Sequence, residues 1–494
     1  MIIGVDVGTS VTKASLLDRD GSALVTHSMR STLQRLPGGR VEQDLEEVVD
    51  SVIRVVREVA ATAEQVGGLV EALAITGQGD GLWLRDHQGQ QVGPAISWLD
   101  ARASGLLDRW AESGVQRQVH ALTGSGMFPG SAGPLLAHLA EHAPERLARA
   151  AVAGYCVDAI VQRFTGEITV DASDASLPFL DVPTRSYSQE ALRACGVAEY
   201  RRLLAEPAPP NKLFALDGRS AKELGLPAGL PVSAGPFDLP ACAFGAGVSD
   251  VGDGSLVIGT TLGCQVLRDE VDIDPHGEVA GMWLATPLPQ RYLRVMPAMV
   301  GTANLDWVLN VVGSHVDQLE TLLDNSKPGA GGVSALSFLS SSGERAPFVE
   351  PHARGQFTGL SLETTQADLV RAMCEAVAYA ARHNLESAGL TGAVSACGGG
   401  ARSAAWSQIF ADVLGRPLHV PHEEGVGARG AAMTAWDSLG EPVDREQWAA
   451  ARRTVVPHPS AVEFYERGYR EYLLSIDRAR PLWGASSRRG AEET

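Results

Sequence analysis

The sequence has few cysteines and no pair of them at metal or redox spacing. Its six cysteines are scattered over 494 residues, with no CxxC pattern and no cysteine–histidine pairing. This usage argues against a disulfide framework or a zinc site and predicts a cytoplasmic, reducing location. The N-terminus has no basic segment ahead of an apolar run, and no run approaches the roughly 18 apolar residues of a membrane span. We therefore expect neither a signal peptide nor membrane insertion.

Positive charge is also scarce. The chain has 41 lysines and arginines against 59 aspartates and glutamates, and a formal net charge of -18. Nucleic acids and anionic membranes bind clustered cations, so neither is expected as a partner. The length predicts two large domains with additions.

The common nucleotide-binding motifs are absent. The sequence contains no GxxxxGK[ST], no HRD with DFG, and no GxGxxG after a strand. If the protein binds ATP, it does so as neither a P-loop protein, a protein kinase nor a dinucleotide enzyme.

The first residues, MIIGVDVGTSVTK, predict two strands joined by a glycine turn, with Asp6 at the end of the first strand. One interpretation is a plain β-hairpin. The other is a phosphate cradle, in which the backbone and hydroxyls of Gly8, Thr9 and Ser10 face an anion while Asp6 holds a metal. The opening stretch alone leaves both interpretations open.

The same pattern returns half a chain later, where an apolar strand meets Gly259-Thr260-Thr261. Such a repeat predicts a duplicated domain. If the two turns share a cleft, they could hold one polyphosphate from opposite sides. Between and after the turns, helical and strand patterns alternate, as in an α/β chain, with long amphipathic helices in 45–67 and 365–389.

Two further stretches could carry chemistry. In CGGGARSAAW, Gly398, Gly399 and Gly400 remove every side chain at a strand end, so a flat base or ribose could lie on the backbone, although a flexible connection explains them equally. Asp238 stands at the start of a small-residue helix. It is either an N-cap or an ionised base that accepts the proton of an attacking hydroxyl, and spacing does not decide between them.

These motifs resemble those of the FGGY family of carbohydrate kinases, from residue 2 to about residue 440. The most specific is GQFTGLSLETTQADLVRAMCE at 355–375, and SGERAPF, FTGE with DASDAS, and GGGARSAAWSQIFAD occur in the family's order. The resemblance implies an α/β protein of two actin-like (ribonuclease H-like) domains with a catalytic cleft between them. We expect an N-terminal domain over 1–247, a C-terminal domain over 248–440, and helices with a mobile tail over 441–494.

The resemblance also implies roles for individual residues. Asp238 is the expected catalytic base. Asp6 and Asp238 are the expected metal residues, with Asp6 beside Mg²⁺ directly or through water. The residues expected to bind ATP are Gly8, Thr9, Ser10, Lys13, Gly259, Thr260, Thr261, Gly398, Gly399, Gly400, Ala401 and Ser403. The resemblance therefore implies ATP and Mg²⁺ as cofactors.

The substrate loop is expected at 77–84, GQGDGLWL. Where xylulose kinases commonly have Met-His and glycerol kinases Arg-Glu, this chain has Gly79 and Asp80. Asp80 should accept hydrogen bonds from two adjacent substrate hydroxyls, and Gly79 should leave room for the substrate. We expect Gln78, Trp98 and Asp238 to contact the substrate as well. Trp98 could equally be a core residue, and Asp100 could simply pair with Arg102. The loop resembles that of erythritol kinases, then L-xylulose kinases.

The sequence departs from the family in one helix of the sugar domain. In PLLAHLAEHAPE, His138 or a neighbour occupies the place of a tryptophan, which weakens any transfer of substrate identity. His138 and His142 also have helical spacing for a metal pair, but a third ligand is lacking, so we interpret them as a solvated face.

We therefore expect an ATP-dependent kinase acting on an erythritol-like tetritol or a pentulose such as xylulose, with ribulose, glycerol and gluconate as alternative substrates. A homodimer is one assembly open to it. The rival hypothesis is a non-catalytic actin-like or Hsp70-like ATPase switch, which would not need the base Asp238.

Overall fold

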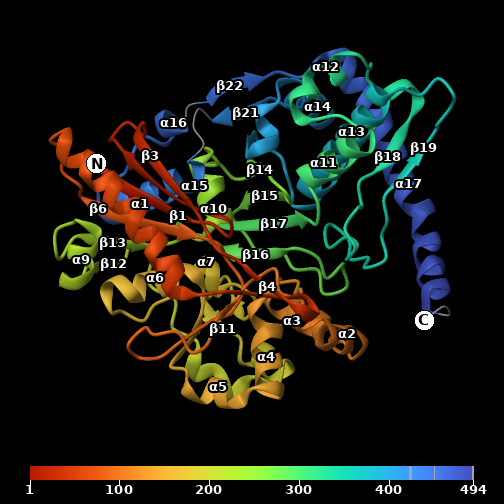
Figure 1. Ribbon diagram of the computed structural model, residues 1–494. Helices are drawn as coiled ribbons and strands as arrows, with labels where there is room; N and C mark the ends of the chain where they lie inside the picture. The colour runs from red at the N-terminus through yellow and green to blue at the C-terminus, as the bar shows by residue number, and fades with distance from the viewer. Residues whose placement is uncertain (422–424, 450, 492–494) are drawn as a thin grey trace. The chain divides into compact units, whose positions relative to one another are not determined.

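The computed structural model describes residues 1–421, 425–449 and 451–491, and it divides into two compact units (Figure 1). Unit 1 consists of Met1–Ser249, Arg268–Leu293 and Gly425–Ala450. Unit 2 consists of Asp250–Leu267, Arg294–Glu424 and Ala451–Thr494. The sequence places a boundary near Gly247 but does not reveal that two later segments return to unit 1. Within the described residues, no helix is both long and apolar enough to cross a membrane.

Unit 1 is built on a sheet with the strand order β12-β13-β6-β1-β2-β3. This sheet consists of β1 (Ile2–Val7), β2 (Val11–Leu17), β3 (Ala23–Arg30), β6 (Ala72–Gly77), β12 (Leu213–Ala215) and β13 (Pro231–Ala234). The other strands of unit 1 lie outside this sheet and are β4 (Gln34–Leu36), β5 (Arg40–Gln43), β7 (Trp83–Arg85), β8 (Ala95–Ile96), β9 (Val152–Gly154), β10 (Leu180–Asp181), β11 (Ser186–Tyr187) and β16 (Met282–Ala285). Its helices are α1 (Leu45–Gln65), α2 (Ser104–Glu112), α3 (Val115–Thr123), α4 (Ala132–His142), α5 (Pro144–Arg149), α6 (Cys156–Thr165), α7 (Ala172–Ala175), α8 (Gln189–Ala194), α9 (Gly218–Leu224), α10 (Asp238–Gly245), α15 (Val426–Ser438) and α16 (Arg445–Trp448).

The central strands of this sheet are apolar because both of their faces are covered. Every residue of β6 is buried, and in β1 only Asp6 is partly exposed. Strand β3, at the edge, alternates between exposed and half-buried residues. The polar residues of these two strands, Asp6 in β1 and Thr76 in β6, lie near the carboxyl ends of the strands.

Helix α15 is the segment that returns from the end of the chain, and Figure 1 shows it, in blue, beside β1 and α10. The close packing of α15 against α10 depends on two glycines. A Cβ at Gly430 would lie 1.9 Å from the Ala241 oxygen, and one at Gly245 would lie 2.0 Å from the Val426 oxygen. Because any side chain there would collide with backbone, these glycines let α10 and α15 pack closely.

Unit 2 repeats the central motif of unit 1. Strand β14 pairs antiparallel with β15 and parallel with β20, as β1 pairs with β2 and β6. Its strands are β14 (Gly254–Ile258), β15 (Leu262–Arg268), β17 (Tyr292–Ala298), β18 (Ser334–Leu336), β19 (Gln356–Thr358), β20 (Val394–Cys397), β21 (Leu418–Pro421) and β22 (Ala451–Val455). Its helices are α11 (Thr302–Val311), α12 (Leu319–Asp324), α13 (Gln366–Ser387), α14 (Ala404–Leu414) and α17 (Pro459–Ala491). The duplicated-domain prediction is thus confirmed at the level of strand pairing.

The end of the chain is helical in its described part, and the mobility expected of it stays a prediction. Helix α17 continues to Ala491, through most of the segment expected to be mobile, and 492–494 lie outside the described residues.

Candidate active site

Asp6 lies at the end of β1, opposite Lys13 on β2 and beside Thr76 on β6. Burial raises the pKa of its carboxyl to about 6, although the nearby charge of Lys13 opposes the shift. Helix α15 approaches closely, since a Cβ at Gly427 would lie 2.7 Å from Asp6 Oδ2. The carboxylate is therefore desolvated and only partly compensated by positive charge.

The turn that follows Asp6 is a hairpin in its geometry. The backbone N–H of Gly8 donates to the Val11 oxygen over 3.1 Å, and Ser10 is exposed at the tip. The hydroxyl of Thr9 does not point freely outward, because it accepts from Trp98 Nε1 at 2.8 Å and donates to Gln78 Oε1 at 3.1 Å. The structure thus brings together three residues that the sequence assigns to two different subsites.

Asp238 is the first residue of α10, and Phe237 occupies the N-cap position. The N-cap interpretation of Asp238 is therefore wrong, although its carboxylate does accept the backbone N–H of Leu239. Burial, together with the negative charges of Asp6 and Asp80, raises the pKa of Asp238 to about 8, although that hydrogen bond opposes the shift. The expectation that the helix N-terminus keeps this side chain ionised is also wrong near pH 7, because desolvation outweighs the helix.

Asp80 lies in a tight turn and is 8% exposed. Its φ of 58° and that of Gly81, 75°, are both left-handed. Asp tolerates this conformation, but Gly81 is required, because a Cβ there would lie 2.6 Å from the Ile96 oxygen. The buried carboxylate of Asp80 is close enough to Asp238 for its negative charge to raise the pKa of Asp238.

The space beside Gly79 is filled. A Cβ at Gly79 would lie 2.4 Å from Cδ2 of Phe237, so the ring of Phe237 packs on the glycine. The expectation that Gly79 leaves room for substrate is therefore wrong. Sequence reasoning missed Phe237, because nothing local links two residues so far apart in the chain.

The carboxylates of unit 1 suit a hard cation. The negative charges of Asp6 and Asp80 raise the pKa of Asp238, and all three side chains offer only oxygen ligands. Among the described residues, no group of three or more side chains could together hold a metal ion. A magnesium ion here would therefore take one or two of these carboxylates and keep water and phosphate as its other ligands.

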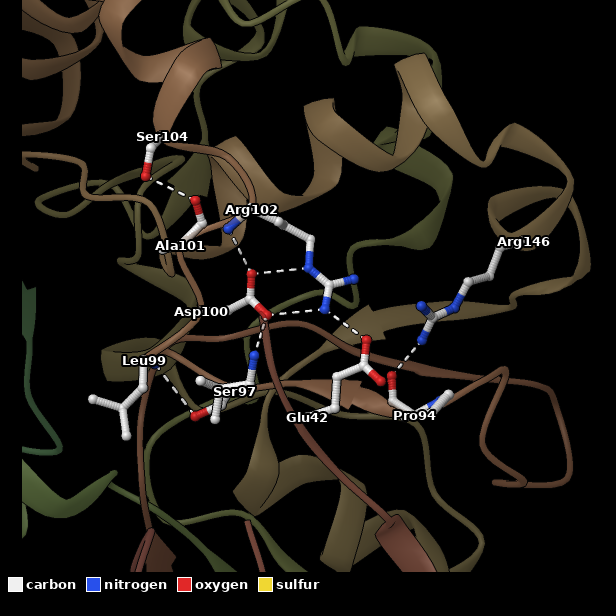
Figure 2. Close-up of polar contacts among 10 residues, drawn as sticks. Glu42, Pro94, Ser97, Leu99, Asp100, Ala101, Arg102, Ser104 and Arg146 are labelled. Carbon is white, nitrogen blue, oxygen red and sulfur yellow. Dashed lines mark hydrogen bonds and ion pairs between the residues drawn. The ribbon is translucent and has the colours of Figure 1, made fainter. Parts of the chain in front are cut away.

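The loop that carries Trp98 is held by an ion-pair network (Figure 2). Arg102 donates to both carboxylate oxygens of Asp100, at 2.8 and 2.9 Å, and to Glu42 at 2.6 Å. Asp100 Oδ2 also accepts the Val41 N–H at 2.6 Å. Asp100 and Arg102 do pair with each other, and their role here is to fasten the loop to β5.

In unit 2, the turn between β14 and β15 contains Gly259, Thr260 and Thr261, and Thr260 is exposed. The N–H groups of Gly301 and Thr302 each donate to a turn carbonyl, those of Thr260 and Gly259, at 2.7 Å. The start of α11 therefore fixes the shape of the turn.

The glycine stretch after β20 lies against the end of β14. Gly398 has a φ of 92°, and a Cβ there would lie 2.6 Å from the Ile258 oxygen. Gly399 is exposed, with nothing within 4 Å of the place a Cβ would take. Ala401 is buried, and Ser403 caps α14 by accepting the Trp406 N–H at 3.0 Å. Within unit 2, exposed backbone at Gly398 and Gly399 therefore lies beside the end of β14, which leads into the turn Gly259–Thr261.

His138 and His142 stack on each other with ring centroids 4.2 Å apart, and His142 Nδ1 contacts the His138 oxygen at 2.9 Å. Burial and the neighbouring His142 lower the pKa of His138. The two histidines therefore interact with each other within α4.

Comparison with known proteins places these features in a family. The family model for the FGGY family of carbohydrate kinases, N-terminal domain, matches residues 1–245, and that for the C-terminal domain matches residues 254–437. The chain is 32% identical to the erythritol kinase of Brucella abortus, and the alignment covers 98% of this chain and 97% of that protein. It is also 32% identical to the xylulose kinase of Escherichia coli, with 88% of this chain and 89% of that protein covered.

The fold agrees with these matches. The crystal structure of a ligand-bound xylulose kinase from Lactobacillus acidophilus superposes with a TM-score of 0.90 at 22% identity, covering 98% of this chain and 99% of that one. The matches give no support to a non-catalytic ATPase switch. The chain belongs to the FGGY family of carbohydrate kinases, with the family's actin-like fold, and is a phosphotransferase that acts on a small sugar or polyol.

Proposed function

We propose that this kinase transfers the γ-phosphoryl group of ATP to a hydroxyl of an erythritol-like tetritol. The observation that carries the proposal is the buried Asp80, which acts electrostatically on Asp238 in unit 1. The similarity to the Brucella abortus erythritol kinase over nearly the whole chain supports it. The ring of Phe237 against Gly79 also favours a short substrate, because it takes up the room that a longer chain would need.

Asp238 is proposed to act as the general base. Its carboxylate accepts the proton of the substrate hydroxyl while that oxygen attacks the phosphorus, and Asp80 accepts hydrogen bonds from neighbouring hydroxyls. A base with a pKa near the working pH is well matched to this task. When the negative charge of Asp6 is balanced, one cause of the raised pKa of Asp238 disappears, so the base ionises more readily.

The remaining assignments concern ATP. Asp6 would hold Mg²⁺, directly or through water, and the ion supplies positive charge against the phosphate oxygens. Within unit 1, Gly8, Thr9, Ser10 and Lys13 are proposed to face the phosphates. Within unit 2, the proposed phosphate residues are Gly259, Thr260 and Thr261, and the proposed adenosine residues are Gly398, Gly399, Gly400, Ala401 and Ser403.

A pentulose is the second candidate substrate, because the chain is equally identical, over less of its length, to a xylulose kinase. The test measures ADP release with Mg-ATP and a panel of erythritol, other tetritols, pentitols, xylulose, ribulose, glycerol and gluconate. We expect the highest kcat/KM with a tetritol. A higher value with a pentulose would favour the second candidate, and ADP release indifferent to every compound would contradict kinase action on this panel.

Melting temperatures provide an independent check. A ligand present at a hundredfold excess over its Kd adds about 2.7 kcal/mol to the free energy of unfolding. The true substrate should therefore raise the melting temperature, whereas compounds that are not turned over should leave it unchanged.

A further inference from the structure

Four side chains of unit 1 form a continuous chain of hydrogen bonds. Trp98 Nε1 donates to Thr9 Oγ1 at 2.8 Å, and Thr9 Oγ1 donates to Gln78 Oε1 at 3.1 Å. Gln78 Nε2 then donates to Gln43 Oε1 at 2.9 Å. The chain links the turn after β1, the turn after β6 and the loop after β8.

The direction of these bonds follows from the chemistry of the groups. An indole N–H can only donate, so the Thr9 hydroxyl accepts from Trp98 and directs its own proton to Gln78. The carbonyl oxygen of Gln78 faces Thr9, and its amide nitrogen faces Gln43. Each member fixes the orientation of the next.

The two glutamines of the chain are buried. Gln78 is 2% exposed and Gln43 is 1% exposed, so breaking a bond between them leaves a polar group without water as a substitute. The loop that carries Trp98 is also fixed on both sides of this residue. Ser97 N–H donates to the Val41 oxygen at 2.9 Å, and the carboxylate of Asp100 binds Arg102 (Figure 2).

We propose that Trp98 and Gln78 are positioning residues for the phosphate turn, which they hold through the hydroxyl of Thr9. The proposal rests on the assignment of the turn Gly8–Ser10 to the phosphates of ATP. It adds a second role to the one expected of both residues, since the indole N–H and the amide carbonyl are already used within the protein. Holding the turn in shape before ATP arrives lowers the cost of ordering its N–H groups around an anion.

The central experiment compares Trp98→Phe, which keeps an aromatic ring but loses the N–H and some volume, with Trp110→Phe as a matched control for the lost volume. Trp110 is buried in α2 of the same unit. Calorimetry measures the Kd for a non-hydrolysable ATP analogue with Mg²⁺, without sugar. Loss of one neutral hydrogen bond should weaken binding about 3- to 10-fold in Trp98→Phe. Trp110→Phe should leave the Kd unchanged, and the KM for the sugar should stay within about twofold in Trp98→Phe because that variant retains the ring.

Thr9 provides the rescue and the coupling test. Thr9→Val removes both hydrogen bonds at nearly constant shape and should weaken analogue binding at least as much as Trp98→Phe, whereas Thr9→Ser should restore it. The double variant Thr9→Val with Trp98→Phe should bind the analogue no more weakly than Thr9→Val alone, because both changes break the same bond. Full additivity of the two losses would overturn the proposal.

Two other results would also overturn it. One is a Trp98→Phe variant that binds the analogue normally but has a raised sugar KM, which would make Trp98 a substrate residue while leaving the proposed function intact. The other is wild-type protein that fails to bind the analogue, which would remove the turn's phosphate role and the proposed function together.

Discussion

The carboxyl group of Asp238 combines a buried position with two acidic neighbours, and this controls both rate and stability. Asp238→Asn removes the proposed base and should lower turnover by about two to four orders of magnitude, the usual contribution of a general base. Binding of a Mg-ATP analogue should persist. Steady-state ADP release and calorimetry measure the two effects, and near-normal turnover would exclude Asp238 as the base.

The same substitution should stabilise the fold, in a pH-dependent way. The pKa of Asp238 is about 8 in the folded chain against an ordinary 3.8, so the folded state binds the proton more tightly. The stability that this proton contributes is complete below about pH 4 and is lost as the pH rises toward 8. Asp238→Asn should therefore melt at a higher temperature than the wild type at pH 8, with a much smaller difference at pH 5. Equal differences at both pH values would contradict the raised pKa.

Asp80 is best tested with Asn, which tolerates the left-handed backbone at a φ of 58°. Asp80→Asn should raise the KM for the true substrate about 5- to 150-fold, because substrate hydroxyls that lose their hydrogen-bond acceptor cost roughly 1–3 kcal/mol of binding free energy. The KM for ATP should not change. It also removes a like charge from Asp238, so the acid limb of the pH–rate profile should move to lower pH. An unchanged sugar KM and an unmoved acid limb would exclude this turn from the substrate site.

At the scale of secondary-structure elements, the glycines after β20 offer a matched pair of variants. Gly399→Ala adds a methyl where nothing lies within 4 Å, so the melting temperature should not change. If the adenosine lies on this backbone, the methyl should raise the KM for ATP. Gly398→Ala should instead lower the melting temperature, because a φ of 92° and a contact of 2.6 Å with the Ile258 oxygen both oppose a side chain. Normal ATP kinetics in Gly399→Ala would place the adenosine elsewhere.

Elements whose signals are local could be predicted from the sequence. The hairpin of β1 and β2, its repeat in β14 and β15, and the Ser403 cap of α14 each depend on residues a few positions apart. Their polar and apolar patterns are complete within a single element, so the pattern alone specifies them.

Contacts between distant elements could not be predicted in this way. Phe237 packs on Gly79, and Trp98 donates to Thr9, across long separations with no local pattern to link them. The raised pKa of Asp238 likewise depends on Asp6 and Asp80. The types of the site residues were therefore predictable, but the environment that sets their protonation was not.

At the scale of the whole molecule, unit 1 needs a segment from the far end of the chain. Ile2 and Leu17 share an apolar cluster with Met433, Trp436 and other residues of 431–448. A fragment of residues 1–249 exposes the face of the sheet that this segment covers. It should therefore melt without a sharp transition and bind a hydrophobic dye.

The comparison fragment joins residues 1–249 to 425–449 through a flexible linker. It should melt at a higher temperature and bind less dye, because α15 again covers β1 and β6. A cooperative transition in 1–249 alone, equal to that of the joined fragment, would show that α15 adds nothing to the stability of unit 1.

The late return of α15 also has a consequence during translation. Strand β1 leaves the ribosome first, whereas Trp436, which packs near Ile2, is made near the end of the chain. At a synthesis rate of about 5–20 residues per second, the interval is roughly 20–90 s. For that time the nascent sheet presents an apolar face to the cell, so a ribosome-associated chaperone that binds such surfaces should be retained until α15 emerges.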